Sequence, residues 1–473
     1  MNSFGIDFGT TNSAAFELYS RQAYGDEEAR PLPSIVIIDK ATDRAFGGRR
    51  AWKEQLSFRE RGGYHVISSI KTLLETNREW FSAQKRWRVA DIAAVVLRQL
   101  NERTLTAGGI TEAMFGIPVG MSPKARRTLR EAAQLAGIRV TGFVKESTAA
   151  VIRYWETVKN CRYVVVFDWG GGTLDISVLE LRGRHIQELA TVGSANAGNR
   201  VDDDLARRVH RLVMETRGTI KALEDLSVSQ QDDLRYHCEL AKCALATQDA
   251  YRLSLFNYDG RDETLEVTRS FCEPVVKPHV TEAIDLLASA INKAELSTDA
   301  IDEILVIGGC SQLWLFREKL RQDARFLAKS TFAENPEWDV AHGAALLQKN
   351  PGCFALGEAL GVQLSDGTRF DLVRPGDISG QTNGTVSLAL VEDTRAANII
   401  VERHLGNGGM PETALAFAIP TQGFDLEEIR LDYHLSEDLT FQVSGQSMAR
   451  DTGTRVERET GELRFTYAIE EER

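Results

Sequence analysis

The sequence predicts an α/β region built from two related halves, followed by a smaller antiparallel β region. Short apolar strands alternate with amphipathic helices over residues 1–347, which is the pattern of α/β folds. An apolar strand followed by a glycine turn occurs twice, at 6–11 and at 167–173. From about residue 361 helices become scarce, and period-two strands follow one another as in a compact antiparallel sandwich.

Each predicted element rests on its apolar periodicity. In the first region we expect strands at Phe4–Asp7, Ser34–Ile38, Met114–Ile117, Tyr163–Asp168, Ile176–Leu181 and Glu303–Ile307. Helices are expected there at Val89–Arg103, Pro123–Ala136, Asp202–Thr216, Gln231–Ala246, Phe271–Glu295 and Leu313–Ala324. In the second region strands are expected at Thr385–Val391, Ile399–Leu405, Ala414–Ile419, Ile429–Leu435, Leu439–Ser444 and Leu463–Ile469. The helix-ending run KNPG at 349–352 places the boundary, giving domains 1–347 and 361–473 and a linker at 348–360.

Composition excludes several classes of protein. A chain of 473 residues exceeds what one hydrophobic core normally serves. The net charge of −12 argues against a binder of nucleic acid or of anionic membranes. Six cysteines without a CxxC pair predict reduced thiols in a cytoplasmic protein. The chain opens on a strand pattern and contains no long apolar run, so we expect neither a signal peptide nor a membrane span.

The two glycine turns are suited to binding phosphate. Glycines allow close backbone approach, and successive N–H groups in such turns form an anion-sized hollow. Asp7, Asp168 and Asp175 lie beside the turns, and a carboxylate next to a phosphate usually indicates a bridging Mg²⁺ with its waters. The pattern GxxxxGK[ST] is absent, which excludes a P-loop ATPase. One glycine run alone would fit a plain hairpin equally well, but the repetition with matching carboxylates favours a phosphate site.

Five segments, in order, resemble the DnaK-type seventy-kilodalton heat-shock chaperones. GIDFGTTNS at 5–13 and FDWGGGTLDIS at 167–177 resemble the two phosphate motifs of that family. KESTAAVIRY at 145–154 resembles its connecting segment, EILVIGGCSQL at 303–313 its adenosine motif, and NPEWDVAHGAAL at 335–346 the helix that follows. The resemblance implies a duplicated actin-like (ribonuclease H-like) ATPase domain that binds ATP and Mg²⁺ in a cleft between its halves.

The resemblance also implies residue roles by position. Asp7, Asp168 and Asp175 resemble the carboxylates around Mg²⁺, held largely through water, and around the attacking water. Lys71 in SSIKTLLE resembles the catalytic lysine, and Glu146 the acidic residue of the connecting segment. Taken alone, Lys71 would be a surface lysine and Glu146 a glutamate at a helix N-terminus. The implied ATP contacts are Gly9, Thr10, Thr11, Asn12, Gly170, Gly171, Gly172, Thr173 (also placed in the catalytic group), Gly198, Glu239, Lys242, Gly308, Gly309, Cys310 and Glu337.

Several positions depart from the family pattern. Cys243 and Gln312 stand where the family has arginines beside adenine, Ala246 stands for a serine, and Ala197-Gly198 for a double glycine. Because stacking and cation–π contacts are lost with the arginines, we expect weaker nucleotide binding or looser base selectivity.

Two further residues resemble a relay of nucleotide state in the family. Pro118 and Arg126 match the relay's proline and arginine in position. They fit equally well a strand-ending proline and an arginine on a helix surface.

Residues 361–473 resemble the β-sandwich that binds extended apolar peptides in the family, on LGVQLSDGTRFDLVRPGD at 360–377 and GNGGMPETALAFAIP at 406–420. A sandwich kept for packing or another contact is the alternative. The sequence ends soon after the last predicted strand, so we expect no helical lid. QKNPGCFALGEA at 348–359 lacks the family's leucine-rich linker, which leaves coupling between ATP state and the β domain open.

The predicted function is that of a divergent, lidless DnaK-like chaperone ATPase with slow hydrolysis of Mg·ATP. Implied partners are unfolded or dedicated client segments, a J-domain co-chaperone and a nucleotide exchange factor, with no nucleic acid or membrane. Two alternatives stay open: a small-molecule kinase on the same actin-like fold, and a nucleotide-sensing scaffold that barely hydrolyses ATP.

Overall fold

The computed structural model describes residues 2–468 apart from 28, 61, 184, 219–220, 327–328, 350–353, 392–393, 406–409, 424–425 and 450–453. It divides into two compact units. The first comprises Met1–Val119, Thr128–Glu180 and Leu189–Lys349, and the second comprises Gly120–Arg127, Leu181–Glu188 and Asn350–Arg473. The predicted linker at 348–360 and the GNGGMPETALAFAIP segment at 406–420 each fall partly outside the described residues.

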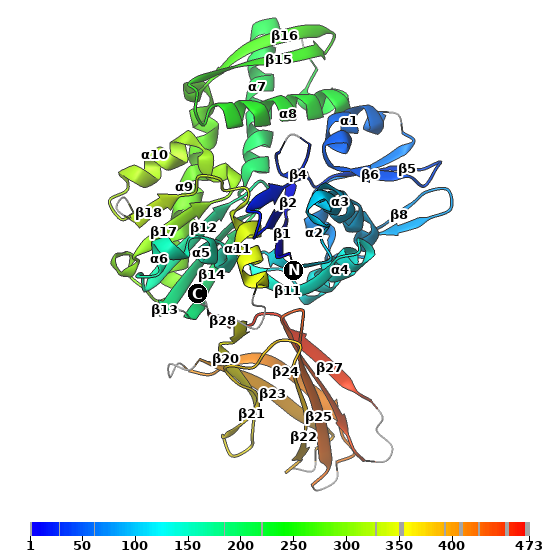
Figure 1. Cartoon of the computed structure of the whole chain (residues 1–473), viewed down its shortest axis with the longest axis vertical. Coiled ribbons are helices and arrows are strands. Elements are labelled where there is room, and N and C mark those ends of the chain that lie inside the picture. Colours follow the sequence, from blue (N-terminus) through cyan, green and yellow to red (C-terminus); the bar gives the residue numbers. More distant parts are fainter. Residues whose placement is uncertain are drawn as a thin grey trace. The chain divides into compact units, whose positions relative to one another are not determined.

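The first half of the first unit contains a mixed sheet in the order β11-β10-β1-β2-β3 (Figure 1). β1 and β2 form an antiparallel pair, whereas β10 and β11 run parallel to β1, as strands joined through helices do. A short strand β4 (Leu32–Pro33) also pairs with β2. The five main strands are β1 (Phe4–Phe8), β2 (Asn12–Glu17), β3 (Gln22–Tyr24), β10 (Glu112–Ile117) and β11 (Arg139–Lys145).

The second half repeats this arrangement in the order β18-β17-β12-β13-β14. β12 and β13 are antiparallel, whereas β17 and β18 run parallel to β12. The strands are β12 (Tyr163–Trp169), β13 (Leu174–Arg182), β14 (His185–Ser194), β17 (Glu303–Ile307) and β18 (Ser330–Phe332). The same order and the same strand directions in both halves confirm the predicted duplicated actin-like architecture.

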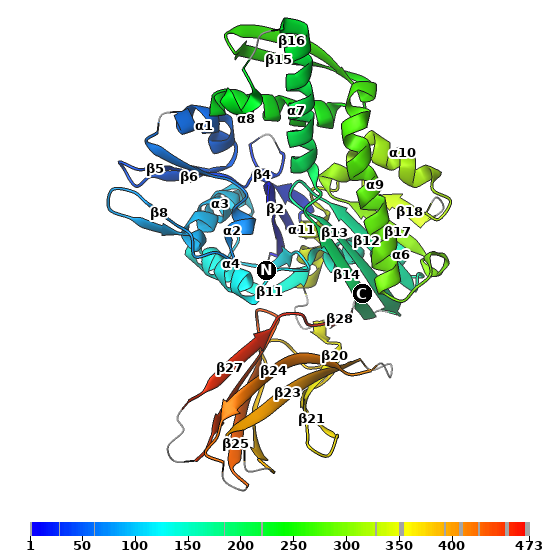
Figure 2. The same ribbon diagram turned by 180° about the vertical axis from the view of Figure 1, so that it is seen from behind.

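Helices surround the two sheets (Figures 1 and 2). The predicted helices are present as α3 (Val89–Arg103), α4 (Pro123–Leu135), α7 (Gly198–Arg217), α8 (Val228–Ala244), α9 (Arg269–Lys293) and α10 (Trp314–Gln322). The remaining helices are α1 (Gly48–Glu60), α2 (Ile70–Leu73), α5 (Glu146–Arg153), α6 (Trp155–Val158) and α11 (Asp339–Gln348). α7 begins four residues before its predicted start. Its first turn therefore includes Gly198 and Asn199, which with Ala197 form what we call the third glycine segment.

Three smaller β elements complete the first unit. A three-stranded sheet consists of β5 (Val36–Asp39), β6 (Ala45–Gly47) and β7 (Tyr64–Ile67). Two hairpins are formed by β8 (Glu79–Phe81) with β9 (Arg86–Arg88) and by β15 (Ala250–Tyr258) with β16 (Arg261–Thr268). Only the β5 strand was predicted from the sequence: β8 and β9 are three residues long and β16 buries only Val267, whereas β15 was overlooked although Tyr251, Leu253 and Leu255 alternate along it.

A glycine contact joins the two halves through α5 and α11. A Cβ atom at Gly343 in α11 would overlap the carbonyl oxygen of Ala149 in α5, and one at Gly5 in β1 would overlap the carbonyl oxygen of Ala341. Glycine is therefore required at both positions for this close approach. Since Glu146 is the first residue of α5, this packing fixes where its carboxylate lies.

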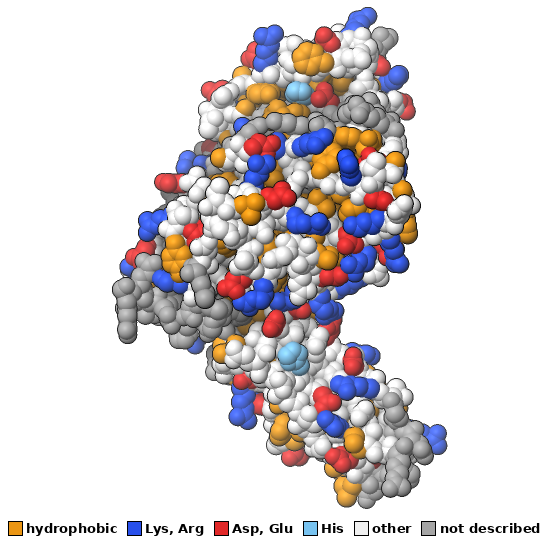
Figure 3. Space-filling view, turned by 45° about the vertical axis from the view of Figure 1, so that its right-hand side comes forward, with side chains coloured by type: hydrophobic (Ala, Val, Ile, Leu, Met, Phe, Trp, Pro, Cys, Tyr) orange, Lys and Arg blue, Asp and Glu red, His pale blue; other side chains and the backbone are white. Residues whose placement is uncertain are grey.

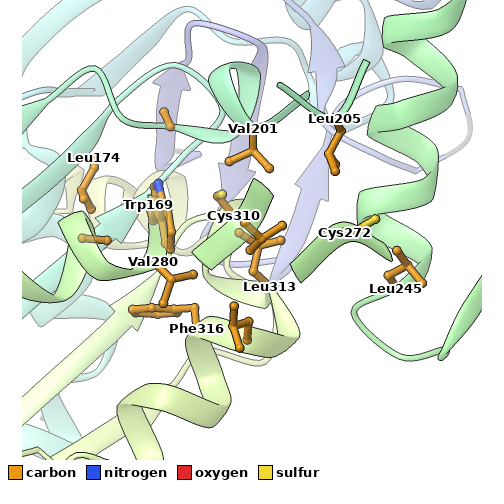
Figure 4. Close-up of a cluster of buried hydrophobic side chains, with 14 of the residues drawn as sticks. Trp169, Leu174, Val201, Leu205, Leu245, Cys272, Val280, Cys310, Leu313 and Phe316 are labelled. Atoms are coloured by element: carbon orange, nitrogen blue, oxygen red, sulfur yellow. The ribbon is translucent and has the colours of Figure 1, made fainter. Parts of the chain in front are cut away.

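The core of the second half holds the site strand in place. Trp169, directly after Asp168, is fully buried, and its ring lies 5.1 Å from the ring of Phe316 (Figure 4). Phe167, directly before Asp168, stacks on Phe316 with ring centroids 4.9 Å apart. Aromatic side chains of this size bury large apolar areas, so Asp168 is carried on a rigid strand end.

The second unit contains two four-stranded antiparallel sheets. One has the order β21-β20-β23-β24, with strands β21 (Arg369–Val373), β20 (Glu358–Gln363), β23 (Ala396–Leu405) and β24 (Glu412–Pro420). The other has the order β22-β25-β26-β27, with strands β22 (Thr382–Ala389), β25 (Glu428–Ser436), β26 (Thr440–Ser447) and β27 (Val456–Thr460). Ile419 of β24 lies over Gly445 of β26, so the sheets pack face to face as the predicted sandwich.

Short strands and a helix end also belong to the second unit. β28 (Phe465–Ala468) pairs with β19 (Phe354–Leu356) on one side and with residues 185–187 of β14 on the other. β28 corresponds to the last strand predicted from the sequence, and β19 and β27 were not predicted. The first residues of α4, from 123 to 127, lie in this unit.

Candidate functional site

The two glycine turns lie opposite each other in the first unit. One connects β1 to β2 at Gly9–Thr11, and the other connects β12 to β13 at Gly170–Thr173. A Cβ atom on Gly171 would lie 2.6 Å from the Thr11 hydroxyl oxygen, and one on Gly172 would lie 2.6 Å from Cγ2 of Thr10. Glycine in the second turn thus allows it to approach the threonines of the first.

Four carboxylates and one lysine lie beside these turns. Asp7 and Asp168 occupy equivalent positions near the ends of β1 and β12, and Asp175 is the cross-strand neighbour of Asp168. Lys71, in α2, donates to Oε1 of Glu146 at 2.6 Å, and each side chain is only 10% exposed. Four segments that are far apart in sequence therefore place their charges in one buried cluster.

The carboxylates of this cluster are held in an unfavourable charge environment. Burial, helped by Glu146, raises the pKa of Asp7 to about 7 and that of Asp175 to about 6, with Lys71 acting against both shifts. Burial and the neighbouring carboxylates raise the pKa of Asp168 well above its usual value. Burial alone would lower the pKa of Lys71, but Glu146 and Asp7 hold it above its usual range. One lysine does not offset four carboxylates, so a bound cation would stabilise this cluster.

Two further glycine segments converge on the same place. Gly308 follows β17 with a φ of +80°, and a Cβ atom there would overlap a carboxylate oxygen of Asp168. The N–H of Gly198 donates to the carbonyl of Gly170 at 3.1 Å, and the N–H of Asn199 donates to the carbonyl of Gly171 at 2.8 Å. The third glycine segment, at the start of α7, is thus bonded directly to the second glycine turn.

A cavity of about 320 Å³ lies next to the third glycine segment. It is formed by the C-terminal end of α8, the short 3₁₀ turn Gly309–Gln312 and the segment before α11. Its lining residues are Lys242, Cys243, Ala246, Gly309, Cys310, Gln312, Leu313, Glu334, Asn335, Pro336, Glu337 and Trp338. Its volume lies at the lower end of the range of small-molecule sites, and its wall mixes apolar surface with a few polar groups.

At the inner end of this cavity is a buried ion pair. Nζ of Lys242 lies 2.7 Å from Oδ2 of Asp202, and it also donates to the carbonyl of Gly198 at 3.2 Å. Burial raises the pKa of Asp202 to about 6, with Lys242 acting against the rise. Lys242 therefore joins the cavity to the third glycine segment.

The donors and acceptors present fit a magnesium nucleotide. Oδ1 of Asp7, Oγ1 of Thr11 and Oδ1 of Asp202 are buried and lack a hydrogen-bond partner in the described part of the chain. Buried polar atoms without partners are costly, so these three indicate groups supplied by a ligand. Among the residues that the structure describes, no three His, Cys, Asp or Glu side chains converge closely enough to hold a metal by themselves. A Mg²⁺ held here would therefore need water and phosphate ligands.

Most predicted site residues come together in this region, with three exceptions. Glu239 is half-buried on α8 and is absent from the cavity lining, although its charge reaches Asp202 and Lys242. Pro118 follows β10 in the first unit. Arg126 lies in the second unit, where its guanidinium donates to the carbonyls of Asp438, Leu439 and Gly461 at 2.7–3.1 Å.

Some residues of the site were missed by sequence reasoning. Asp202 is one of three consecutive aspartates in α7, and no sequence signal distinguishes the buried one from its neighbours. Trp338 lies within the NPEWDVAHGAAL segment, Leu313 is the last residue of the EILVIGGCSQL segment, and Glu334 directly precedes the first of these. Both motifs pointed to this region, but the sequence did not single out these three residues.

The family model described as Hsp70 protein matches residues 42–350 of this chain. The chain belongs to the Hsp70 family. Curated relatives named chaperone protein DnaK are similar to it: that of Thermotoga maritima is 30% identical over 359 residues, and that of Thermotoga neapolitana is 29% identical over the same length. Each match covers 72% of this chain and 58% of the relative. This Hsp70-family chain thus aligns with less than two thirds of the length of these DnaK proteins.

Proposed function

We propose that this Hsp70-family chain binds and slowly hydrolyses ATP with Mg²⁺ in its first unit, as the enzymatic part of a chaperone. The observation that carries the proposal is the buried cluster of Lys71 with Glu146, Asp7, Asp168 and Asp175, placed beside two facing glycine turns. Phosphoryl transfer depends on positioning and charge neutralisation rather than on covalent help from the protein, and this cluster supplies both.

Each residue of the cluster has a role that follows from its surroundings. Bound Mg·ATP would supply the phosphoryl group and a divalent cation that offsets negative charge. The ammonium group of Lys71, held in place by Glu146, stabilises negative charge that develops nearby. Asp7, Asp168 and Asp175 would hold and orient the water around the cation.

The glycine turns and their hydroxyl groups would hold the phosphates. The backbone N–H groups of Gly9–Asn12 and Gly171–Thr173, with the Thr10, Thr11 and Thr173 hydroxyls, would provide the donors for anionic oxygens, whereas the N–H of Gly170 donates to the Thr173 carbonyl within the turn. Oγ1 of Thr11 is buried and has no hydrogen-bond partner among the described residues, so a phosphate oxygen would satisfy it.

The cavity bounded by α8 and the NPEW segment would hold the base and ribose. Lys242, Gly309, Cys310 and Glu337 line it as expected, and Cys243, Ala246 and Gln312 line it without any arginine. A cavity wall without a guanidinium group lacks cation–π and stacking contacts with the base. ATP binding here is therefore weaker, or less selective for the base, than in family members that have arginines at these positions.

The sandwich of the second unit is the proposed site for unfolded or dedicated client segments. Two face-to-face antiparallel sheets are the support on which loops can hold an extended peptide. Coupling of this unit to ATP, through Pro118 and Arg126, belongs to the proposal, as do a J-domain co-chaperone and a nucleotide exchange factor.

The net charge of −12 does not favour a nucleic acid or an anionic membrane as the partner. On the face drawn in Figure 3, acidic and basic side chains are interspersed in the part of the surface that is described. Within the described residues, no helix is long and apolar enough to cross a membrane.

Phosphate release from Mg·ATP, measured without any acceptor, tests the proposal. A slow, Mg²⁺-dependent release that a client peptide or a J-domain protein accelerates is the expected result. Release only after a hydroxyl substrate is added would favour the small-molecule kinase, and tight ATP binding without release would favour the nucleotide-sensing scaffold. Peptide arrays on the isolated full-length chain, with and without ATP, identify client segments and show whether ATP changes their binding.

A further inference from the structure

A buried polar network lies behind the third glycine segment and takes no direct part in the proposed chemistry. Asn196 is fully buried, and all of its polar groups are bonded. Its N–H donates to Oγ of Ser194 at 3.0 Å, and its carbonyl accepts from Nε1 of Trp169 at 2.8 Å. Its side-chain amide donates to the carbonyl of His279 at 2.9 Å, and its Oδ1 lies 2.6 Å from Nδ1 of the same histidine.

His279 connects this asparagine to two helices. It lies on α9, is 7% exposed, and its Nε2 lies 2.9 Å from Oδ2 of Asp204 on α7. Its chain neighbour Val280 packs in the same cluster as Trp169 (Figure 4). α7, α9 and the end of β12 are thus joined at Asn196.

The position of Asn196 in the chain connects this network to the phosphate-binding turns. It directly precedes Ala197 and Gly198, and the N–H of Gly198 is bonded to the second glycine turn. Ala197 is buried in an extended conformation where the family has a glycine, and the network holds the loop that leads into it. Trp169, on the other side of the network, follows Asp168. Any shift of Asn196 therefore moves the third glycine segment relative to Asp168.

We propose that His279, acting through Asn196, is a positioning residue for the phosphate-binding turns. This inference rests on the proposed function, because it assumes that these turns bind the phosphates of ATP. A packing role alone would be met at lower cost by apolar side chains, since a buried polar group costs free energy unless it is hydrogen-bonded. His210, which is also buried, shows the contrast, because its Nδ1 bonds to the Tyr258 hydroxyl at 2.7 Å and to no group of a glycine turn.

Two conservative substitutions separate the two bonds of the ring. The amide nitrogen of asparagine can take the place of Nδ1, and that of glutamine the place of Nε2. His279→Asn therefore keeps the side-chain bond to Asn196, whereas His279→Gln keeps only the side-chain bond to Asp204; the backbone carbonyl of residue 279 can accept from Asn196 in both variants. His210→Gln is the matched control, because it changes a buried histidine in the same hydrophobic core without touching a glycine turn.

Isothermal titration with Mg·ATP and with adenosine provides the readout, with a thermal melt to show that each variant is folded. We expect His279→Gln to weaken Mg·ATP binding about tenfold, the loss of one buried hydrogen bond, and to leave adenosine binding unchanged. His279→Asn and His210→Gln should bind Mg·ATP within about twofold of the wild type.

The positioning role is overturned if His279→Gln loses equal affinity for Mg·ATP and for adenosine. It is also overturned if His279→Gln binds Mg·ATP as tightly as the wild type does. If the glutamine variant does not fold, Asn196→Leu, which is similar in size and removes the Oδ1 that bonds Nδ1 of His279, replaces it under the same criteria. A wild-type chain that binds no Mg·ATP would instead overturn the proposed function, so the two failures are distinguishable.

Discussion

Replacement of Lys71 tests the charge cluster most directly. In Lys71→Met the side chain keeps much of its length but loses its ammonium group. Because Lys71 and Glu146 form an ion pair in which each side chain is 10% exposed, removing one partner should lower the free energy of unfolding by about 3–5 kcal/mol. Loss of a preorganised cation from the site should slow hydrolysis by about 100- to 1000-fold.

A double variant separates these two effects. Lys71→Met with Glu146→Gln removes both charges of the pair, so most of the lost stability should return. Its hydrolysis should stay slow, because the cation is still missing. Stability is measured by urea denaturation, and hydrolysis by single-turnover release of phosphate with enzyme in excess over ATP. Wild-type turnover by the double variant would refute the role given to Lys71.

Lys242→Met is the matched control for this experiment. Lys242 is also a buried lysine paired with a carboxylate, Asp202, at 2.7 Å, but it lies at the cavity rather than beside the catalytic carboxylates. Its loss should weaken ATP binding and leave the single-turnover rate of bound ATP within about threefold of the wild type. An equal fall in the single-turnover rate for both lysine variants would show that loss of either buried cation slows hydrolysis and that Lys71 has no specific catalytic role.

Three further predictions concern affinity, packing and pH. Cys243→Arg should tighten ATP binding by about 2- to 30-fold through a cation–π contact with the base, whereas Cys243→Ala should change it little. Calorimetric titration measures both affinities, and weaker ATP binding by the arginine variant would contradict the prediction. Gly343→Ala should destabilise the first unit by about 1–3 kcal/mol or more, because its Cβ overlaps the Ala149 carbonyl; Gly309→Ala, with open space at its Cβ, is the control in the same denaturation assay. Burial raises the pKa of Asp339 from 3.8 to about 6, whereas Tyr154 and Arg153 act to lower it. The folded protein therefore binds this proton more tightly than the unfolded chain does. The stability that results is fully present below pH 4 and is lost as the pH rises through 6. Asp339→Asn should therefore gain up to about 3 kcal/mol relative to the wild type between pH 4 and pH 7, less the lost Arg153 contact at 3.6 Å, and an unchanged difference across that range would exclude the effect.

The sequence was most informative where local periodicity and motifs coincide. α3 and β17 have the bounds that their apolar patterns predict, since both are long or continuous apolar runs within a packed core. The hairpins β8–β9 and β15–β16 were not predicted. β8 and β9 are only three residues long and β16 buries a single residue, whereas the alternation of Tyr251, Leu253 and Leu255 along β15 was overlooked. The start of α7 was misplaced for a related reason: its first turn is Gly198–Val201, and glycine there weakens the helical signal.

For the candidate site, the sequence alone determined the chemical groups and their order along the chain: two glycine turns with adjacent aspartates, a lysine, and a family resemblance that implied their roles. Only the tertiary structure decided which of these groups meet. Lys71 reaches Glu146 across 75 residues, Lys242 reaches Asp202 across 40, and His279 reaches Asn196 across 83. Such contacts are set by how helices and sheets of the two halves pack. The burial that results, and the raised pKa values of Asp7 and Asp175 that follow from it, are properties of the folded chain and of no local segment of its sequence.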